Sequence, residues 1–518
     1  MKLFRAGCLV LLPTFSTALP SRDVSPAPVH ACSGPSFKQP EIAGAQILSI
    51  TAREFLAYSI PSIGLTNLNF CEVNVAYTHP GMNDTVQVQI WLPLNNYNSR
   101  FQGVGGGGYA ATLGETGLGP AVAEGYATAA TDSGTDSMVL TPAGWAFKSP
   151  GVVNYDLVRQ WAYTSLNELP IIGKAITESF YCSAPVYSYW TGCSNGGRQG
   201  LITAQRYPEH YDGILANAPA MLASDWLPAA FWGQIVASSL PGPMPSACEF
   251  DAITAASVKA CDGLDKVMDG VLSALDLCTF NPQTLVGQSF HCSTTNTTQT
   301  FTSKAATIVQ KIWEGPTTPN GTSLWNGYSK DAAIAALVTD IGQPGAITLA
   351  TTWMQYFVTK NPSLDVSTMT LEQFYSYFTS SVAEYSELAD GADPNLSPFK
   401  HAGGKMLTWH GSADSLIPVE NTIRYYRDVE KGDEDVRDYY RFFVAQGIAH
   451  CSGGAGYYPT GSFDALVQWV EKGVEPERLT GTSMTGREQP LCVWPLVARW
   501  DGVGDEGVAG SYSCAETF

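Results

Sequence analysis

The stretch that decides the fold is Trp190-Thr-Gly-Cys-Ser-Asn-Gly-Gly-Arg198. It contains Gly192-x-Ser194-x-Gly196, the spacing of a nucleophile elbow, in which a serine occupies a very tight turn between a strand and a helix. Residues 186–190 are β-prone and residues 198–206 are helix-prone. The flanking glycines leave room for the turn because they have no Cβ. The alternative is an ordinary glycine-rich strand-to-helix turn, but the strand–turn–helix context favours the elbow.

The length and charge of the chain narrow its class. With 518 residues and a hydrophobic content of 45%, the chain is expected to form one large domain with a big insertion, or two domains. It carries 28 basic and 47 acidic residues, a net charge of −19. This balance argues against nucleic acid and against anionic membrane surfaces as partners. It suits a self-repelling secreted protein.

The N-terminus predicts export. Lys2 and Arg5 precede an apolar run over residues 6–15 and then Ser16-Thr-Ala18, which is the pattern of a signal peptide spanning residues 1–18. The run is too short to cross a bilayer, and no later stretch is long and apolar enough to do so. We therefore expect a secreted, extracellular protein without a membrane partner.

The cysteines and sequons agree with that compartment. One of the twelve cysteines, Cys8, lies in the signal segment, so eleven remain and at least one is expected to be unpaired. Four N-glycosylation sequons predict a glycoprotein with these asparagines at the surface: Asn83, Asn296, Asn320 and Asn395.

The order of elements predicts an α/β fold interrupted by a lid. Strand-like and helix-like segments alternate up to about residue 221 and resume at residue 401, which argues for a mainly parallel sheet with helices on both faces. Residues 222–400 lack this rhythm and are interpreted as an inserted lid domain. Residues 19–221 and 401–518 then form the main domain. The expected segments are strands at 86–92, 126–131, 405–410 and 440–444, and helices at 155–176, kinked or split by Pro170, and 419–430.

A serine nucleophile needs a base and a group that orients the base. Asp414 and His450 each follow a predicted strand, and the order Ser194, Asp414, His450 is the chain order of the α/β-hydrolase triad. The alternatives are that His450 is a hydrogen-bonded surface histidine and that Asp414 caps a helix.

Two cysteines adjoin these residues, because Cys193 precedes Ser194 and Cys451 follows His450. A disulfide between them would hold the two Cα atoms about 4.4–6.8 Å apart and bring nucleophile and base within reach. The alternative is that Cys193 is a small core residue and Cys451 pairs elsewhere.

The oxyanion of an acyl-transfer reaction needs two backbone donors. The amide of Asn195 is the first candidate, and the run Gly105–Gly108 supplies the second, with Gly107 favoured over its neighbours. A phosphate cradle is the alternative for the glycine run, but the Gly-Lys-Ser/Thr ending of a P-loop is absent from it.

A second constellation lies in residues 261–278. Asp262, Asp265 and Asp269 are close together in the sequence, and hard oxygen ligands at this density fit Ca²⁺. The spacing is not that of an EF-hand. The alternative is a solvated acidic loop stapled by a disulfide, in which three carboxylates would repel one another.

Taken together, these motifs resemble the tannase and feruloyl esterase family from about Cys32 to Cys514. The resemblance rests on Cys193-Ser194, Asp414, His450-Cys451 and the glycine loop. It implies secreted serine esterases with an α/β-hydrolase fold, a lid and a structural calcium ion, to which Val267 and Val271 would add carbonyl oxygens. Lys266 stands where the family has glycine, and Thr135 lies in a segment that also departs from the family pattern.

The resemblance also implies a disulfide set, given as Cys32–Cys71, Cys193–Cys451, Cys261–Cys278 and Cys492–Cys514. Cys248 and Cys292 are left as a fifth pair. Cys182 would then be the unpaired thiol.

By the same resemblance we expect hydrolysis of hydroxycinnamoyl (feruloyl-type) esters on plant cell-wall saccharides, by a monomer or homodimer. The alternatives are a tannase-type galloyl ester hydrolase, another aromatic-ester hydrolase, an acyltransferase, and a catalytically silent secreted carbohydrate-binding protein. Lid aromatic residues are candidates to stack on the acyl ring or, equally, to be core residues: Trp226, Trp232, Trp353, Tyr356 and Phe357.

Overall fold

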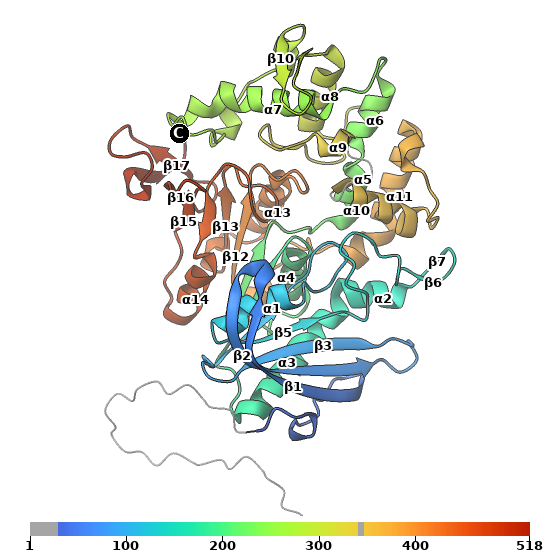
Figure 1. Cartoon of the computed structure of the whole chain (residues 1–518), viewed down its shortest axis with the longest axis vertical. Helices are drawn as coiled ribbons and strands as arrows, with labels where there is room; N and C mark the ends of the chain where they lie inside the picture. Colours follow the sequence, from blue (N-terminus) through green and yellow to red (C-terminus); the bar gives the residue numbers. More distant parts are fainter. Residues whose placement is uncertain (1–29, 340–345) are drawn as a thin grey trace, which may run out of the picture. The chain divides into compact units, whose positions relative to one another are not determined.

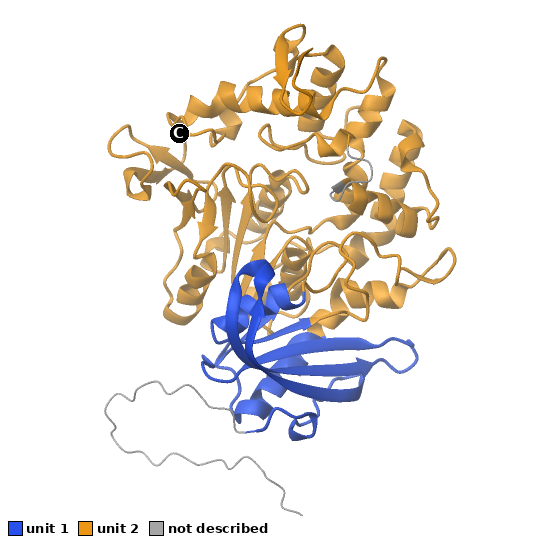
Figure 2. Ribbon diagram, in the orientation of Figure 1, with its two compact units in different colours: residues 1–103, 114–130, 168–188 blue, residues 104–113, 131–167, 189–518 orange. Residues whose placement is uncertain are grey.

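The structure, a computed structural model, describes residues 30–339 and 346–518 (Figure 1). The predicted signal peptide and Cys8 lie outside these residues. The chain divides into two compact units (Figure 2). Unit 1 comprises residues 1–103, 114–130 and 168–188, and unit 2 comprises residues 104–113, 131–167 and 189–518.

Unit 1 is built on five strands in the order β1 (Gln46–Ile60), β2 (Leu65–Thr78), β3 (Val86–Pro93), β5 (Ala127–Thr131) and β4 (Arg100–Val104). The first three pair in antiparallel fashion, and β4 pairs with β5 in parallel. The alternation of buried and exposed residues in β3 and the buried run in β5 confirm the strands predicted there. Helix α1 (Glu115–Ala123) and most of α3 (Ser165–Tyr181) complete the unit.

A buried ionic cluster lies within unit 1. His79 Nδ1 is 2.5 Å from Asp84 Oδ2, and His79 Nε2 is 2.7 Å from Glu168 Oε1. Tyr77 donates to the other Glu168 oxygen at 2.6 Å. Burial lowers the pKa of His79, but the hydrogen bonds and charges of Asp84 and Glu168 outweigh it and raise that pKa above its ordinary value.

Unit 2 contains four parallel strands in the order β8 (Tyr187–Cys193), β9 (Gly213–Asn217), β12 (Lys405–Gly411) and β13 (Tyr440–Ala445). Helices α4 (Asn195–Arg206) and α13 (Val419–Gly432) connect strands of this set, and α14 (Ser462–Lys472) follows β13 (Figure 1). The predicted strands at 405–410 and 440–444 and the helix at 419–430 are confirmed. Because the strands are parallel, their carboxyl ends share one edge, and Ser194, Asp414 and His450 all follow these ends.

The lid segment is mainly helical. Between β9 and β12 the chain forms helices α5 (Ala223–Ala229), α6 (Trp232–Ser239), α7 (Ala247–Cys261), α8 (Ser303–Glu314), α9 (Ala336–Thr339), α10 (Ala346–Trp353), α11 (Leu371–Ala389) and α12 (Ser397–His401), with one hairpin, β10 (Ser289–Cys292) and β11 (Thr297–Thr300). Its core also includes Tyr109, Trp145 and Trp161, which precede the lid in sequence. The compact units therefore do not divide at residues 222 and 400.

The helix expected over residues 155–176 is interrupted, but not at Pro170. It consists of α2 (Tyr155–Arg159), a π-helical turn at Gln160–Thr164, and α3, which continues through Pro170. At the wide turn the Ser165 hydroxyl donates to the Gln160 carbonyl at 2.8 Å. The hairpin β6 (Phe147–Ser149) and β7 (Val152–Val153) precedes this segment.

The C-terminal region adds two small antiparallel sheets. One contains β14 (Tyr458–Thr460), β15 (Arg478–Thr482) and β16 (Glu488–Cys492), and the other pairs β17 (Val497–Trp500) with β18 (Tyr512–Ala515). Across the described residues, no helix is long and apolar enough to span a bilayer. The four sequon asparagines are exposed.

Five disulfides join described cysteines, and they are the four implied by the family resemblance together with the fifth pair: Cys32–Cys71, Cys193–Cys451, Cys248–Cys292, Cys261–Cys278 and Cys492–Cys514. The prediction that Cys182 is an unpaired thiol is wrong, because Cys182 is disulfide-bonded. That prediction came from the odd number of cysteines left once Cys8 was assigned to the signal segment, and Cys8 lies outside the described residues. No described cysteine is free.

Candidate active site

The elbow at Ser194 has the strained backbone that its sequence predicts. Strand β8 ends at Cys193, α4 begins at Asn195, and Ser194 between them has φ 62° and ψ −120°. A Cβ at Gly192 would lie 2.5 Å from the Gly196 backbone, so only glycine fits there. Such a conformation is costly for a serine and is typical of a nucleophile on an α/β-hydrolase sheet.

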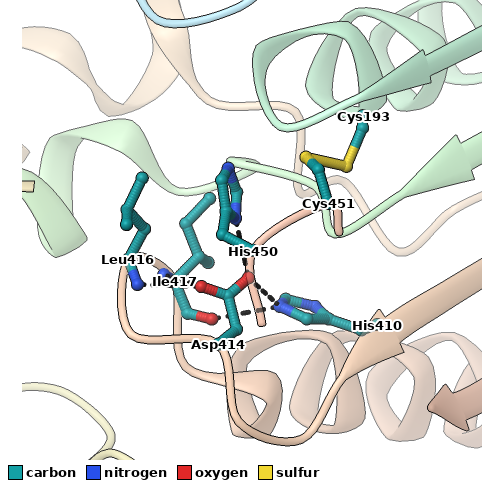
Figure 3. The surroundings of a disulfide bond; sticks show 7 residues. All are labelled: Cys193, His410, Asp414, Leu416, Ile417, His450 and Cys451. Atoms are coloured by element: carbon teal, nitrogen blue, oxygen red, sulfur yellow. Dashed lines mark hydrogen bonds and ion pairs between the residues drawn. A yellow bond between two sulfur atoms is a disulfide. The ribbon is translucent and has the colours of Figure 1, made fainter. Parts of the chain in front are cut away.

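The disulfide Cys193–Cys451 joins the end of β8 to the loop that follows β13. Its Cα atoms are 5.9 Å apart although 258 residues separate them in sequence (Figure 3). Ser194 and His450 are the direct neighbours of these cysteines. Ser194 Oγ and His450 are not hydrogen-bonded to each other in the described chain, and in serine hydrolases this bond often tightens only when substrate binds.

Asp414 orients His450. Its Oδ2 lies 2.7 Å from His450 Nδ1, and its Oδ1 accepts from the amides of Leu416 and Ile417 at 2.8 and 2.9 Å (Figure 3). Asp414 is completely buried. Burial by itself would raise the pKa of Asp414, but the charges and hydrogen bonds of His450 and His410 hold it well below its usual range. The carboxylate therefore stays ionised and holds Nδ1 of His450, which leaves Nε2 for the nucleophile.

A second histidine on the same carboxylate was not predicted. His410 Nε2 lies 3.1 Å from Asp414 Oδ2 and 3.0 Å from the Ile417 carbonyl, and His410 Nδ1 lies 2.8 Å from Thr422 Oγ1. Two acceptors face Nε2, so this nitrogen carries a proton. The sequence signal for this contact is the spacing His410-x-x-x-Asp414 at the end of β12.

The glycine loop is fastened to the elbow. Gly196 N donates to Gly106 O at 2.9 Å, Gly106 N donates to the Gln199 side chain at 2.9 Å, and Asn195 Nδ2 donates to Ala110 O at 3.1 Å. The amide of Gly107, the predicted second donor, is already bonded to Ala110 O at 3.1 Å. Gly108, one residue later, has φ +55°, and a Cβ there would lie 2.1 Å from the Val139 carbonyl.

Near Ser194, the backbone amides of Asn195 and Gly108 are both available as hydrogen-bond donors. Neither donates a hydrogen bond in the described chain, and both residues line the same cavity as Ser194. The amide of Asn195 is thus available to an oxyanion, and the amide of Gly108 is available where that of Gly107 is already bonded.

This cavity is small, about 30 Å³, and mostly apolar. Trp161, Trp226 and Tyr109 contribute aromatic surface, and Leu416 and Ile417 come from the loop that carries Asp414. The indole nitrogens of Trp161 and Trp226 are buried and have no hydrogen-bond partner among the described residues. The site thus has apolar walls, and the two indole N–H groups within them are buried and make no hydrogen bond to described residues.

Of the lid aromatics that were candidates to stack on an acyl ring, only Trp226 lines this cavity. Trp353 and Phe357 are buried core residues, and Tyr356 packs on Phe147. Trp232 lines a different cavity and packs on Phe374. Their sequence positions could not separate cavity from core, because both require aromatic residues on lid helices.

The aspartate-rich loop is compact. Asp262 Oδ1 accepts from the amides of Asp269 and Gly270, Asp265 Oδ1 from that of Val267, and Asp269 Oδ1 from that of Val271. Asp265 Oδ2 is buried without a hydrogen-bond partner, and burial raises the pKa of Asp265 to about 6. No set of three or more His, Cys, Asp or Glu side chains is grouped to hold a metal in the described residues. Asp265 nevertheless keeps one free, buried oxygen ligand.

Comparison with known proteins agrees with the geometry. The family described as "Tannase and feruloyl esterase" matches residues 71–515. A probable feruloyl esterase of Arthroderma benhamiae is 40% identical over 94% of both chains, and a tannase of Aspergillus oryzae is 29% identical over 88% of this chain and 87% of its own.

Solved structures are similar as well. A tannin acyl hydrolase from Aspergillus niger superposes with a TM-score of 0.82 at 30% identity, covering 92% of each chain. Feruloyl esterase B from Aspergillus oryzae superposes with a TM-score of 0.77 at 25% identity, and the match covers 92% of this chain and 97% of the other. The fold and the elbow are thus those of an α/β-hydrolase. More narrowly, the chain belongs to the tannase and feruloyl esterase family, and it is a carboxylic ester hydrolase.

Proposed function

We propose that this protein is a secreted serine esterase that hydrolyses hydroxycinnamoyl (feruloyl-type) esters of plant cell-wall saccharides, with Ser194, His450 and Asp414 as its triad. The observation that carries the proposal is the 2.7 Å contact between His450 Nδ1 and Asp414 Oδ2, made by a histidine whose neighbour Cys451 is bonded to Cys193, the residue before Ser194. These two contacts support a site in which Ser194, His450 and Asp414 act as nucleophile, base and orienting carboxylate.

In this mechanism His450 Nε2 accepts the Ser194 proton while Oγ attacks the ester carbonyl. The tetrahedral intermediate collapses when His450 returns that proton to the leaving alcohol, which leaves an acyl-enzyme. Water, deprotonated by His450, then attacks the acyl carbon and releases the aromatic acid and free Ser194. Asp414 stabilises the imidazolium in both steps.

The oxyanion of both intermediates would be bound by the amides of Asn195 and Gly108. Both are unused in the resting chain, and Asn195 also stands at the positive end of α4. One such donor contributes about 3–4 kcal/mol in the transition state. Gly107 instead holds the loop in shape through Ala110.

The cavity favours an aromatic acyl group with oxygen substituents. Its walls are apolar and aromatic, and its two unpartnered donors, Trp161 Nε1 and Trp226 Nε1, suit ether or phenol oxygens as acceptors. A hydroxycinnamoyl group fits this description, and relatives are named feruloyl esterases. A galloyl ester is the second candidate because another relative is named tannase.

Turnover tests these alternatives. Methyl ferulate and methyl gallate rank the two acyl groups, and an added alcohol acceptor tests acyl transfer. Labelling of Ser194 by an organophosphate, with Ser194→Ala as the control, tests the nucleophile. A protein that turned over neither ester and was not labelled at Ser194 would instead be a silent binding protein.

We also propose a structural calcium ion held by the carboxylates of Asp262, Asp265 and Asp269 and the carbonyls of Val267 and Val271. Support comes from the buried, unpartnered Asp265 Oδ2, which a divalent cation would satisfy. Its chemistry would be structural: it would neutralise three carboxylates in one loop. Secretion and glycosylation of the four exposed asparagines complete the proposal, supported by the leader-like N-terminus and the disulfides.

A further inference from the structure

Arg198 is the one charged residue among the described residues that line the cavity beside Ser194. It is 1% exposed and lies on α4, four residues after the nucleophile. Burial lowers its pKa to about 9, so the side chain is a cation at neutral pH. A buried cation is costly unless it is paired with an opposite charge or well hydrogen-bonded.

The guanidinium is held by neutral groups. Its Nη1 donates to the carbonyl of Ala389 at 2.9 Å and to that of Ala162 at 3.3 Å, and its centre lies 4.0 Å from the Trp161 ring centroid. Asp390, the carboxylate in electrostatic range, is bonded to the amide and hydroxyl of Ser224 instead, and burial raises its pKa to about 7.

A third carbonyl, that of Trp161, accepts from Nη2 at 3.4 Å, and the bond from Nε connects Arg198 to the oxyanion donors. Arg198 Nε donates to Asn195 Oδ1 at 2.8 Å, and Asn195 Nδ2 donates to Ala110 O at 3.1 Å. Ala110 O also accepts from Gly107 N, the residue before Gly108. One side chain thus fixes the plane of Asn195 and, through it, the loop that carries the second donor.

We propose that Arg198 is a positioning residue of the oxyanion hole, which aligns the Asn195 and Gly108 amides and supplies a positive field that stabilises the oxyanion. The inference rests on the proposed serine-esterase mechanism. The field acts in a desolvated cavity, where a fixed charge is screened far less than in water.

Arg206 provides a matched control. It lies on the same helix, its guanidinium lies 4.3 Å from the Tyr163 ring centroid, and it donates to the carbonyl of Glu387 on α11. It makes the same kinds of contact as Arg198, with an aromatic ring and a backbone carbonyl, without touching Asn195 or the cavity. Arg206 is exposed and donates to one carbonyl, whereas Arg198 is buried and donates to three, and only Arg198 is connected to the oxyanion donors.

The test compares Arg198→Met, Arg198→Lys and Arg206→Met on an aryl ester, with an arylboronic acid as a tetrahedral analogue that forms its adduct on Ser194. In Arg198→Met, kcat should fall about 100-fold, as for a lost oxyanion donor, with little change in KM. The boronate Ki should rise by the same factor while the Kd of the product acid stays constant. The kcat and boronate Ki of Arg198→Lys should lie between those of Arg198→Met and the wild type. Both constants should be unchanged in Arg206→Met.

Asn195→Ala keeps the backbone amide and removes only the connecting side chain, so it carries the test if Arg198→Met does not fold. Its kcat and boronate affinity should fall in parallel. Wild-type kcat and boronate Ki in Arg198→Met, or in Asn195→Ala, would overturn the inference. Full activity in Ser194→Ala would instead overturn the proposed function, so the two failures are distinguishable.

Discussion

His410 and His450 share one carboxylate oxygen, since Asp414 Oδ2 lies 3.1 Å from His410 Nε2 and 2.7 Å from His450 Nδ1. His410 and Asp414 are both completely buried. A second imidazole donor prevents the carboxylate from rotating away from the base. The orientation of His450 therefore depends on a residue that never meets the substrate.

Replacement of His410 by Gln is expected to lower kcat by about 10- to 100-fold, because a loosened Asp414 misplaces His450 relative to Ser194. KM for methyl ferulate should change little. Steady-state kinetics on the folded variant check this, with the exposed His401→Gln as the control. Wild-type kcat in His410→Gln would show that His450 and the two amides are enough to hold Asp414.

Removal of the disulfide by Cys193→Ala with Cys451→Ala should reduce activity by about 100-fold, because the covalent restraint on nucleophile and base is lost. The parallel strands do not depend on this bond, so the far-UV circular dichroism spectrum should be retained. The same double substitution at Cys492 and Cys514, which tie β16 to β18, is the control. Equal activity in the two double variants would show that the restraint is dispensable for catalysis.

Trp161→Phe and Trp226→Phe keep the aromatic ring and delete one N–H donor each. If these donors meet ring oxygens, each variant should lose about tenfold in kcat/KM on methyl ferulate, as expected for a lost hydrogen bond to a buried group. Methyl cinnamate, which lacks ring oxygens, should be hydrolysed as by the wild type. Equal losses on both esters would mean that the indoles serve packing alone.

The cluster around His79 predicts pH-dependent stability. The pKa of His79 is raised in the folded chain, so its contribution is fully present below the ordinary histidine value, about 6.5, and is lost as pH rises through the folded value. The pKa of Asp84 is lowered in the folded chain, so Asp84 stabilises the fold at pH values above its ordinary pKa. The pKa of Glu168 is raised, which has the opposite effect on stability. Thermal unfolding of wild type and His79→Gln should therefore differ more at pH 6 than at pH 9. A pH-independent difference would contradict the charged-histidine interpretation.

Chelation of calcium should lower the melting temperature by several degrees, as expected when a ligand that binds only the folded chain is removed. Added Ca²⁺ should restore it. Asp265→Asn should abolish the response, and Asp276→Asn, outside the proposed ligand set, should keep it. Identical melting curves with and without chelator would count against the metal.

Much of this site was predictable because its signals are local in sequence. The Gly192–Gly196 spacing predicts a tight backbone turn. The cysteines next to Ser194 and His450 predict a long-range contact, because a disulfide fixes the distance between the residues that it joins. Asp414 follows from its place after a buried strand. The sheet strands follow from apolar runs and alternation.

Three features could not be predicted because they depend on tertiary packing: the second oxyanion donor, the aromatic residue that lines the cavity, and the position of the break in the helix. Gly107 and Gly108 look the same in sequence, and only the bond from Gly107 N to Ala110 O separates them. Trp226 and Trp353 are both lid aromatics, and burial alone cannot say which one lines a cavity. Pro170 is accommodated within α3, and the wide turn forms earlier, at Gln160–Thr164.

The bond between Cys193 and Cys451 joins positions 258 apart in sequence and so closes a ring that contains residues 222–400, the predicted lid. A protease that cuts one exposed lid loop would leave the two fragments linked, and they would separate on a gel only after reduction. The lid can therefore accumulate insertions, sugars or even a broken backbone while serine and histidine stay joined through their neighbours.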